Sequence, residues 1–151
     1  MRRKINPPDE LPAGESGENL REAFALLLPI RRQRLRRSER QQRQHEQRLA
    51  QLQSAQRDAE RQLTQRRAAY QTLRDGFDGA HLGHQPLTEL QRGLQQEQRA
   101  ADAMQRQRQI LSDCAVQCDT QSARLAAARA ETQQRQRELE KLEMLMQEMP
   151  S

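Results

Sequence analysis

The chain has 151 residues, with 26 basic and 21 acidic side chains giving a net charge of +5, and it contains one Tyr, two Phe and no Trp. Only 34% of the residues are hydrophobic, which excludes a compact core of ordinary size, and the single Val and three Ile exclude a β-domain. The longest apolar run, Ala23 to Ile30, is far shorter than the roughly 20 residues that span a bilayer. The abundance of Arg, Gln, Ala and Leu instead predicts an all-α protein with long helices.

The N-terminal part combines turn residues with a short apolar stretch. We expect residues 1–18 to be disordered, because they carry several helix breakers and no apolar periodicity. These breakers are Pro7, Pro8, Pro12, Gly14 and Gly17. For residues 19–28 we expect a short helix capped by Asn19 and Glu22, or a segment that leads into the main helix, which opens at Pro29. Acidic residues before the apolar stretch and arginines after it reverse the order of a secretory signal, so we expect a cytoplasmic protein.

Gly and Pro divide the rest of the chain into two helices. No Gly or Pro occurs in residues 30–75 and no Pro in residues 87–149, so both segments can form uninterrupted helices. The segment between them is rich in turn residues and too short for a domain, which predicts that the helices fold back on each other. We expect an antiparallel coiled-coil hairpin over residues 29–149, with its turn at 76–86. A turn centred near residue 81 places residue 24 opposite about residue 138.

Both helices carry apolar residues at the spacing of a coiled-coil seam. The first seam runs in steps of seven from Leu28, through Leu35, Gln42, Leu49, Gln56, Leu63, Tyr70 and Phe77, with companions at Leu52, Ala59 and Leu73. The second runs through Leu87, Leu90, Leu94, Ala101, Met104, Leu111, Ala115, Cys118, Leu125, Leu139 and Met146. Its polar exceptions are Glu97, Arg108, Ser122, Arg129, Thr132, Gln136 and Glu143. So many polar positions predict a thin, bendable coiled coil.

The positive charge is concentrated in one stretch. Residues 28–48 carry eight basic and two acidic side chains, whereas residues 49–151 carry fourteen of each. The arginines of this stretch are Arg31, Arg32, Arg34, Arg36, Arg37, Arg40 and Arg43, followed by Arg48. Such a run is either a solvated helix face or a binding surface for an acidic partner. The use of Arg rather than Lys favours forked hydrogen bonding to carboxylate or phosphate groups.

The residues give no indication of catalysis. A two-helix hairpin has no dry concave pocket in which ionisable groups can be tuned, so we expect neither an enzyme nor a cofactor. Asp78, His81 and His84 in the turn are of ligand type, but a Gly-rich loop holds a metal poorly. Cys114 and Cys118 lie one helical turn apart, and we expect both to be reduced and structural.

Two other classes of function stay open. The calculated isoelectric point of about 10.2 and the arginine-rich helix are compatible with RNA binding, although the scattered aromatic residues form no stacking platform. The apolar stretch beside the arginines is also compatible with membrane attachment. A generic cytosolic coiled-coil scaffold has the same features.

The stretch from Leu28 to Arg40, LPIRRQRLRRSER, resembles the start of the YscO (SctO) family of stalk proteins in type III secretion systems, which are related to the flagellar export protein FliJ. The resemblance covers roughly residues 28–145. It includes the Gln/Arg/Glu-rich first helix, the short turn and the second helix ending in RELEKLE, Arg137 to Glu143. Residues 1–25 lie outside it.

The resemblance implies a non-enzymatic stalk that enters the central opening of a hexameric secretion ATPase and links it to the cytoplasmic domain of the export gate. It also implies a place at the cytoplasmic face of the bacterial apparatus, with export chaperones as further partners and without specific nucleic acid or membrane insertion. The implied ATPase contacts are Arg31, Arg32, Arg34, Arg36, Arg37 and Arg40, and the implied gate contacts are Tyr70, Leu73, Phe77 and Leu82. The residues leave open whether the apparatus is an injectisome or a flagellum.

Overall fold

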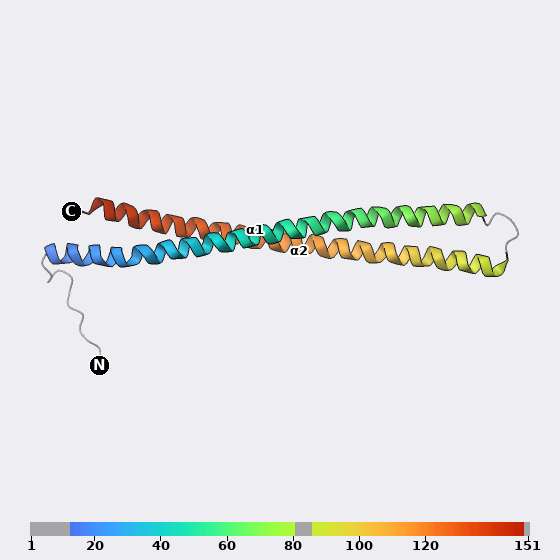
Figure 1. The fold of residues 1–151 in the computed structure, drawn as a ribbon, viewed down its shortest axis with the longest axis horizontal. Helices are drawn as coiled ribbons and strands as arrows, with labels where there is room; N and C mark the ends of the chain where they lie inside the picture. The colour runs from blue at the N-terminus through green and yellow to red at the C-terminus, as the bar shows by residue number, and fades with distance from the viewer. Residues whose placement is uncertain (1–12, 81–85, 150–151) are drawn as a thin grey trace, which may run out of the picture. The chain divides into compact units, whose positions relative to one another are not determined.

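Two long helices make up the structure, a computed structural model that describes residues 13–80 and 86–149, with side chains in 17–76 and 86–149. Helix α1 spans Ala13–Ala80 and helix α2 spans Leu87–Glu148, and these ranges contain no strand (Figure 1). The all-α hairpin predicted from the sequence is confirmed. Over its described length, neither helix has an apolar stretch that could cross a membrane.

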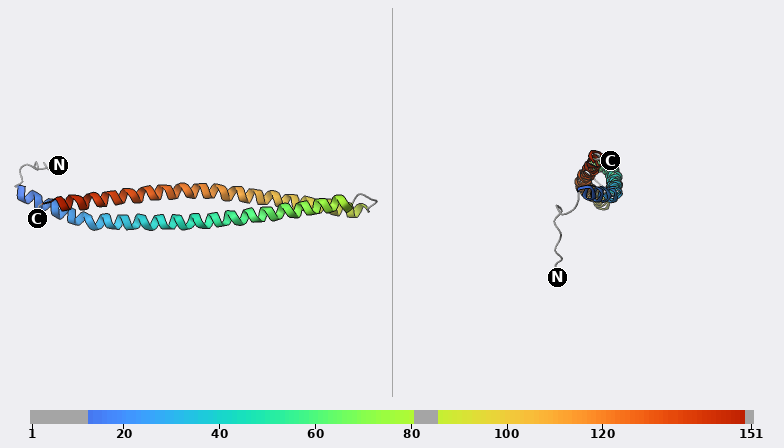
Figure 2. Two further views of the ribbon diagram at one scale, coloured as in Figure 1. Left: turned by 90° about the horizontal axis from the view of Figure 1, so that it is seen from above. Right: turned by 90° about the vertical axis from the view of Figure 1, so that its left-hand side faces the viewer.

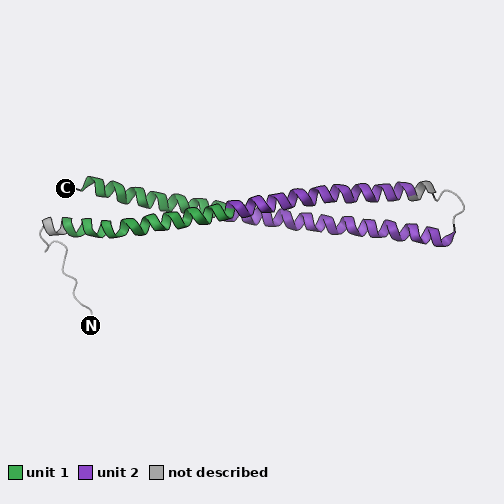
Figure 3. Cartoon of the chain, viewed as in Figure 1, with its two compact units in different colours: residues 1–45, 125–151 green, residues 46–124 purple. Residues whose placement is uncertain are grey.

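The contacts divide the hairpin into two units. Unit 1 consists of residues 1–45 and 125–151, and unit 2 consists of residues 46–124 (Figure 3). Within each unit, a segment of α1 and a segment of α2 lie side by side and run in opposite directions, as seen from both sides in Figures 1 and 2. Each unit is therefore a short antiparallel two-helix coil.

Helix α1 begins earlier than the sequence indicated. Residues 13–18, expected to be disordered, are helical, and residues 19–28 are no separate helix, because α1 continues through Pro29. A proline inside a helix costs about 3 kcal/mol, since it removes an N–H group and crowds the preceding turn. Half-buried Phe24, Leu28 and Leu35 on both sides of Pro29 supply packing that offsets this cost. The expected disorder of residues 1–12 concerns a segment outside the described ranges.

The turn is also shorter than expected. Helix α1 continues through Gly76 to Ala80, so the first five residues of the expected turn at 76–86 are helical. Glycine weakens a helix by about 1 kcal/mol without forbidding it, and no described glycine has a positive φ. Helix α2 starts directly after Pro86, whose carbonyl accepts from the amides of Glu89 at 3.0 Å and Leu90 at 3.2 Å.

The seam of α1 follows the predicted positions as far as Tyr70, whereas the predicted companion Leu73 is exposed. Residues of reduced exposure recur at alternating steps of three and four, with a last step of seven. They are Phe24, Leu28, Arg31, Leu35, Ser38, Gln42, His45, Leu49, Leu52, Gln56, Ala59, Leu63 and Tyr70. Glu39 and Glu46, which follow Ser38 and His45, are also half-buried but lie outside this spacing. This regular period confirms the heptad pattern over these positions, polar ones included.

The seam of α2 was only half correct. One predicted series is confirmed at Leu90, Met104, Leu111, Cys118, Leu125, Leu139 and Met146. The companion series lies one residue earlier than predicted, at Gly93, Ala100, Gln107, Cys114, Gln121, Ala128, Arg135, Leu142 and Met149. Ala101 and Ala115 of the predicted series are also half-buried. Leu87 and Leu94 are consequently exposed. The predicted and the observed series of seam positions have the same period. The observed series buries Ala128 and Leu142, whereas the predicted series would have placed their polar neighbours Arg129 and Glu143 in the seam.

The pairing of the helices is shifted along α2. A turn centred on residue 81 would place Ser38 opposite residue 124 and Ala59 opposite residue 103. Instead, Ser38 hydrogen-bonds Thr132 in unit 1, and the carbonyl of Ala59 accepts from Gln107 in unit 2. The contact of residue 138 is with Arg31 rather than with residue 24. The extension of α1 to Ala80 moves the turn towards α2 and explains the direction of the shift.

Both units have a small buried core. Among the described residues, the buried hydrophobic side chains are Leu52, Ala59, Leu63 and Cys118 in unit 2 and Leu125, Ala128 and Leu142 in unit 1. Polar Ser38, Gln107 and Gln121 are buried with them, and both cysteines are free thiols. So thin a core leaves most of the surface of both helices available for partners.

Candidate interaction surface

The most distinctive surface of the chain is made by six exposed arginines of α1 in unit 1. We call this set the arginine surface: Arg32, Arg34, Arg36, Arg37, Arg40 and Arg43. None of the six makes a hydrogen bond or ion pair with another described residue. At about 100° per residue they cover the whole side of α1 that faces away from α2. The only acidic residue among them in the sequence is Glu39.

Arg31, the first arginine of the run, has a different position. It lies in the seam, is half-buried, and donates from Nη1 to the backbone carbonyl of Glu138 at 2.8 Å. Its guanidinium therefore helps to join α1 to α2, and it is less available to a partner than the other five predicted ATPase contacts. This distinction could have been made from the sequence, because Arg31 stands seven residues before Ser38 in the heptad.

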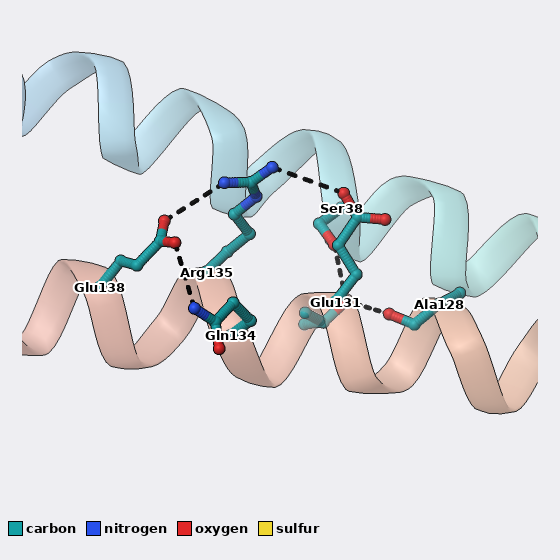
Figure 4. A network of polar contacts seen from close by, with 7 residues as sticks. Ser38, Ala128, Glu131, Gln134, Arg135 and Glu138 are labelled. Atoms are coloured by element: carbon teal, nitrogen blue, oxygen red, sulfur yellow. Dashed lines mark hydrogen bonds and ion pairs between the residues drawn. The ribbon is translucent and has the colours of Figure 1, made fainter.

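A polar network links the two helices next to the arginine surface (Figure 4). Ser38 is 3% exposed, and its Oγ lies 3.0 Å from Oγ1 of Thr132. The Thr132 hydroxyl donates its single hydrogen to the carbonyl of Ala128 at 3.0 Å, so Ser38 is the donor in the cross-helix bond. A buried serine is thereby satisfied, and it fixes the pairing of the helices at this level.

Charged residues of α2 continue this network. Arg135 lies between two carboxylates, 3.7 Å from Glu131 and 3.3 Å from Glu138 (Figure 4). Partial burial raises the pKa of Glu138, but hydrogen bonds from Arg135 and Gln134 and the charges of Arg135 and Arg31 outweigh it. The net effect lowers the pKa of Glu138 below its ordinary value. Glu138 therefore stays a carboxylate to a lower pH than an ordinary glutamate.

The same residues line an open depression between α1 and α2 of about 290 Å³. Its lining consists of Arg34, Arg37, Ser38, Gln41, Glu131 and Arg135. Three guanidinium groups against one carboxylate give the depression a positive charge, and Arg135 is already paired with glutamates of its own helix. Arg34 and Arg37 therefore remain to contact an acidic side chain of a partner. Among the described residues, no group of His, Cys, Asp and Glu could hold a metal ion.

The predicted gate contacts lie near the turn, in unit 2, and the structure describes only part of them. Tyr70 is half-buried in the seam and, with Leu94 and Ala101, lines a depression of about 200 Å³. Leu73 is 37% exposed. The backbone of Phe77 belongs to α1, whereas its side chain and the whole of Leu82 fall outside the described residues.

Two leucines near the turn were assigned to the seam and not to a surface. Leu87 is 68% exposed and Leu94 is 52% exposed, because the second seam lies one residue earlier than predicted. Near the turn, unit 2 thus has four apolar residues that are exposed or half-buried, Tyr70, Leu73, Leu87 and Leu94, of which Tyr70 and Leu94 line one depression. We call these four residues the apolar surface of unit 2. In the sequence, Ala128 and Leu142 in the other half of α2 favour the observed seam positions, whereas Leu87 and Leu94 favour the predicted ones.

Comparison with protein-family models, with curated proteins and with solved structures gives no match for this chain. Its function is therefore inferred from its own surfaces, of which the arginine surface of unit 1 has the highest charge and the least internal use.

Proposed function

We propose that this chain is a non-enzymatic stalk protein of a type III secretion apparatus in the bacterial cytoplasm. Unit 1 enters the central pore of the hexameric secretion ATPase, and the end of unit 2 near the turn contacts the export gate. The observation that carries this proposal is the arginine surface, six exposed guanidinium groups on one helix without a partner among the described residues. The resemblance of residues 28–145 to the YscO family supplies the identity of the partners.

The arginine surface fits the physical requirements of a stalk. An exposed ion pair contributes only about 0.2–1 kcal/mol, so individual contacts form and break easily while several together hold a partner. A ring of ATPase subunits that changes shape needs such reorienting contacts. A large dry interface would fix the stalk in one orientation, because burial of apolar area stabilises a single geometry.

The apolar surface of unit 2 provides the second contact. Leu73, Leu87 and Leu94 are exposed, and Tyr70 lines a depression together with Leu94. A contact of this kind with the gate is short and mostly apolar, unlike the charged contact of unit 1. Phe77 and Leu82 remain part of the proposed gate contact on the basis of the resemblance.

The test is the turnover of the secretion ATPase from the same genome, measured with increasing amounts of the purified chain. We expect the wild-type chain to raise turnover at low salt and the variant R32Q/R34Q to need about tenfold more protein for the same effect. The variant R66Q/R67Q loses the same charge from exposed arginines of unit 2 and serves as the control. Equal stimulation by both variants, or no binding of the wild type at low salt, contradicts the proposal.

The arginine surface favours one alternative, binding of RNA. A gel shift with unrelated RNA that persists at physiological salt would assign the chain to that class, because nonspecific phosphate contacts weaken steeply with salt. If neither the ATPase nor RNA binds, a generic coiled-coil scaffold is the better description.

A further inference from the structure

A second apolar stripe runs along α1 in unit 1, on the side that does not face α2. Its residues are Ala23, Leu26 and Ile30, and their spacing of three and four is that of a coiled-coil seam. Asn19 and Gln33 continue the same spacing at the two ends. Leu26 is 72% exposed and Ile30 is 45% exposed. Phe24 and Leu28 of the same segment already belong to the seam with α2, so α1 has two apolar faces here.

Unpaired charges of opposite sign stand at the two ends of this stripe. Glu18 and Glu22 precede it, and Arg36 and Arg40 follow it. At about 100° per residue, all four project within about 40° of one another, along one flank of the stripe. None of the four has a hydrogen-bond or ion-pair partner in the part of the chain that the structure describes.

We propose that a second copy of this chain docks on the stripe, with its α1 antiparallel to the first. In an antiparallel pair of identical helices, equivalent flanks face each other, so Glu18 and Glu22 of each copy meet Arg36 and Arg40 of the other. Two-fold symmetry forms this set of ion pairs twice, and Leu26 and Ile30 of both copies meet at the centre. In a parallel pair each flank faces the opposite flank of the partner, so Glu18 and Glu22 would not meet Arg36 and Arg40, and these ion pairs would not form.

The dimer occupies part of the arginine surface. Arg36 and Arg40 cannot contact a second copy and an acidic partner at the same time, so self-association and partner binding compete. The self-association itself requires only residues of this chain, and it holds or fails independently of the ATPase.

The test is sedimentation equilibrium of the full chain without any partner. We expect a reversible dimer for the wild type and a monomer for L26Q/I30Q, whose substituted positions are exposed and whose helicity can be verified by circular dichroism. The variants E18R/E22R and R36E/R40E each turn attraction into repulsion, and we expect both to dimerise at least about tenfold more weakly. The control R66E/R67E, with the same charge change in unit 2, should dimerise like the wild type.

Two further samples test the charge pairing itself. An equimolar mixture of E18R/E22R with R36E/R40E should form dimers again, and so should the variant that carries all four substitutions. A wild-type chain that stays monomeric at all concentrations overturns the proposal. So does a dimer that is indifferent to both charge reversals, because its interface then lies elsewhere.

Discussion

Units 1 and 2 have the same architecture and different surfaces. Unit 2 contains 11 basic and 10 acidic residues, whereas unit 1 contains 15 and 11. The buried polar groups also differ: unit 2 uses Gln107, which donates to the carbonyl of Ala59 at 3.1 Å, and unit 1 uses Ser38 beside a charged network. The same two-helix packing thus occurs in unit 2, which is nearly neutral, and in unit 1, which is basic. Charge placement, rather than fold, distinguishes the segment that we assign to the ATPase.

The largest expected effect is on the core of unit 1. Leu142 is 1% exposed, the lowest value among the large described side chains. We expect Leu142→Ala to lower the free energy of unfolding by about 2–4 kcal/mol, because it leaves a cavity in a core with few other residues. Urea unfolding followed by circular dichroism measures this. Leu145→Ala, at a position 40% exposed, is the control and should cost less than about 1 kcal/mol. Equal losses would mean that unit 1 has no ordered core.

The polar layer of unit 2 gives the next effect. Gln107→Ala removes the cross-helix hydrogen bond to Ala59 and should lower the free energy of unfolding by about 1 kcal/mol. Gln105→Ala, at an exposed position of the same helix, corrects for the difference in helix propensity. If the two variants are equally stable, the glutamine layer does not hold the helices together.

A smaller effect on stability is expected at Gly76, which is helical in the structure and was predicted to lie in the turn. A Cβ atom on Gly76 would meet no atom within 4 Å, and the residue is helical. Gly76→Ala should therefore raise the free energy of unfolding by about 0.5–1 kcal/mol. A loss of stability in the same urea experiment would place Gly76 in a turn that requires glycine.

The smallest effect concerns pH. Because the pKa of Glu138 is lowered in the fold, its contribution is complete above the pKa of an unfolded glutamate and is lost as the pH falls through the lowered value. Glu138→Gln should remove this part of the acid sensitivity, by about 0.5 kcal/mol or less for a side chain about one-third exposed. Urea unfolding of the wild type and of this variant at acid and at neutral pH measures the effect, and a pH profile that the substitution leaves unchanged contradicts it.

The sequence predicts the architecture well because breakers and heptads act locally. The absence of Gly and Pro from residues 30–75 and the recurrence of Leu28, Leu35, Leu49 and Leu63 were sufficient to find α1 and its seam. The predicted start and end of α1 were wrong because Pro29 and Gly76 were treated as residues that interrupt a helix. Packing along the rest of a long helix compensates for both, and this compensation depends on the partner helix.

The second seam and the polar network were harder to predict. Leu87 and Leu94 favour one frame, Ala128 and Leu142 favour the other, and only the pairing with α1 decides between them. The pairing also decides that Arg31 and Arg135 serve the helix contact while Arg32 and Arg34 do not. The run of arginines was visible in the sequence, and the heptad separates Arg31 from the others, but the pairing of Arg135 with Glu131 and Glu138 required the structure.

The central claim is that the arginine surface of unit 1 serves no contact within the chain. The direct measurement compares the free energy of unfolding of R32Q/R34Q/R43Q with that of R66Q/R67Q/R74Q, in which three exposed arginines of unit 2 are replaced. Both variants are unfolded in urea at concentrations at which the chain is monomeric. Because each replaces three helical arginines by glutamine, the change in helix propensity is the same in both and cancels in the comparison. We predict that the unit 1 variant is at least as stable as the unit 2 variant, because removing crowded like charges relieves repulsion. A unit 1 variant less stable by about 1 kcal/mol or more would show that these arginines hold the hairpin together, and would contradict the account.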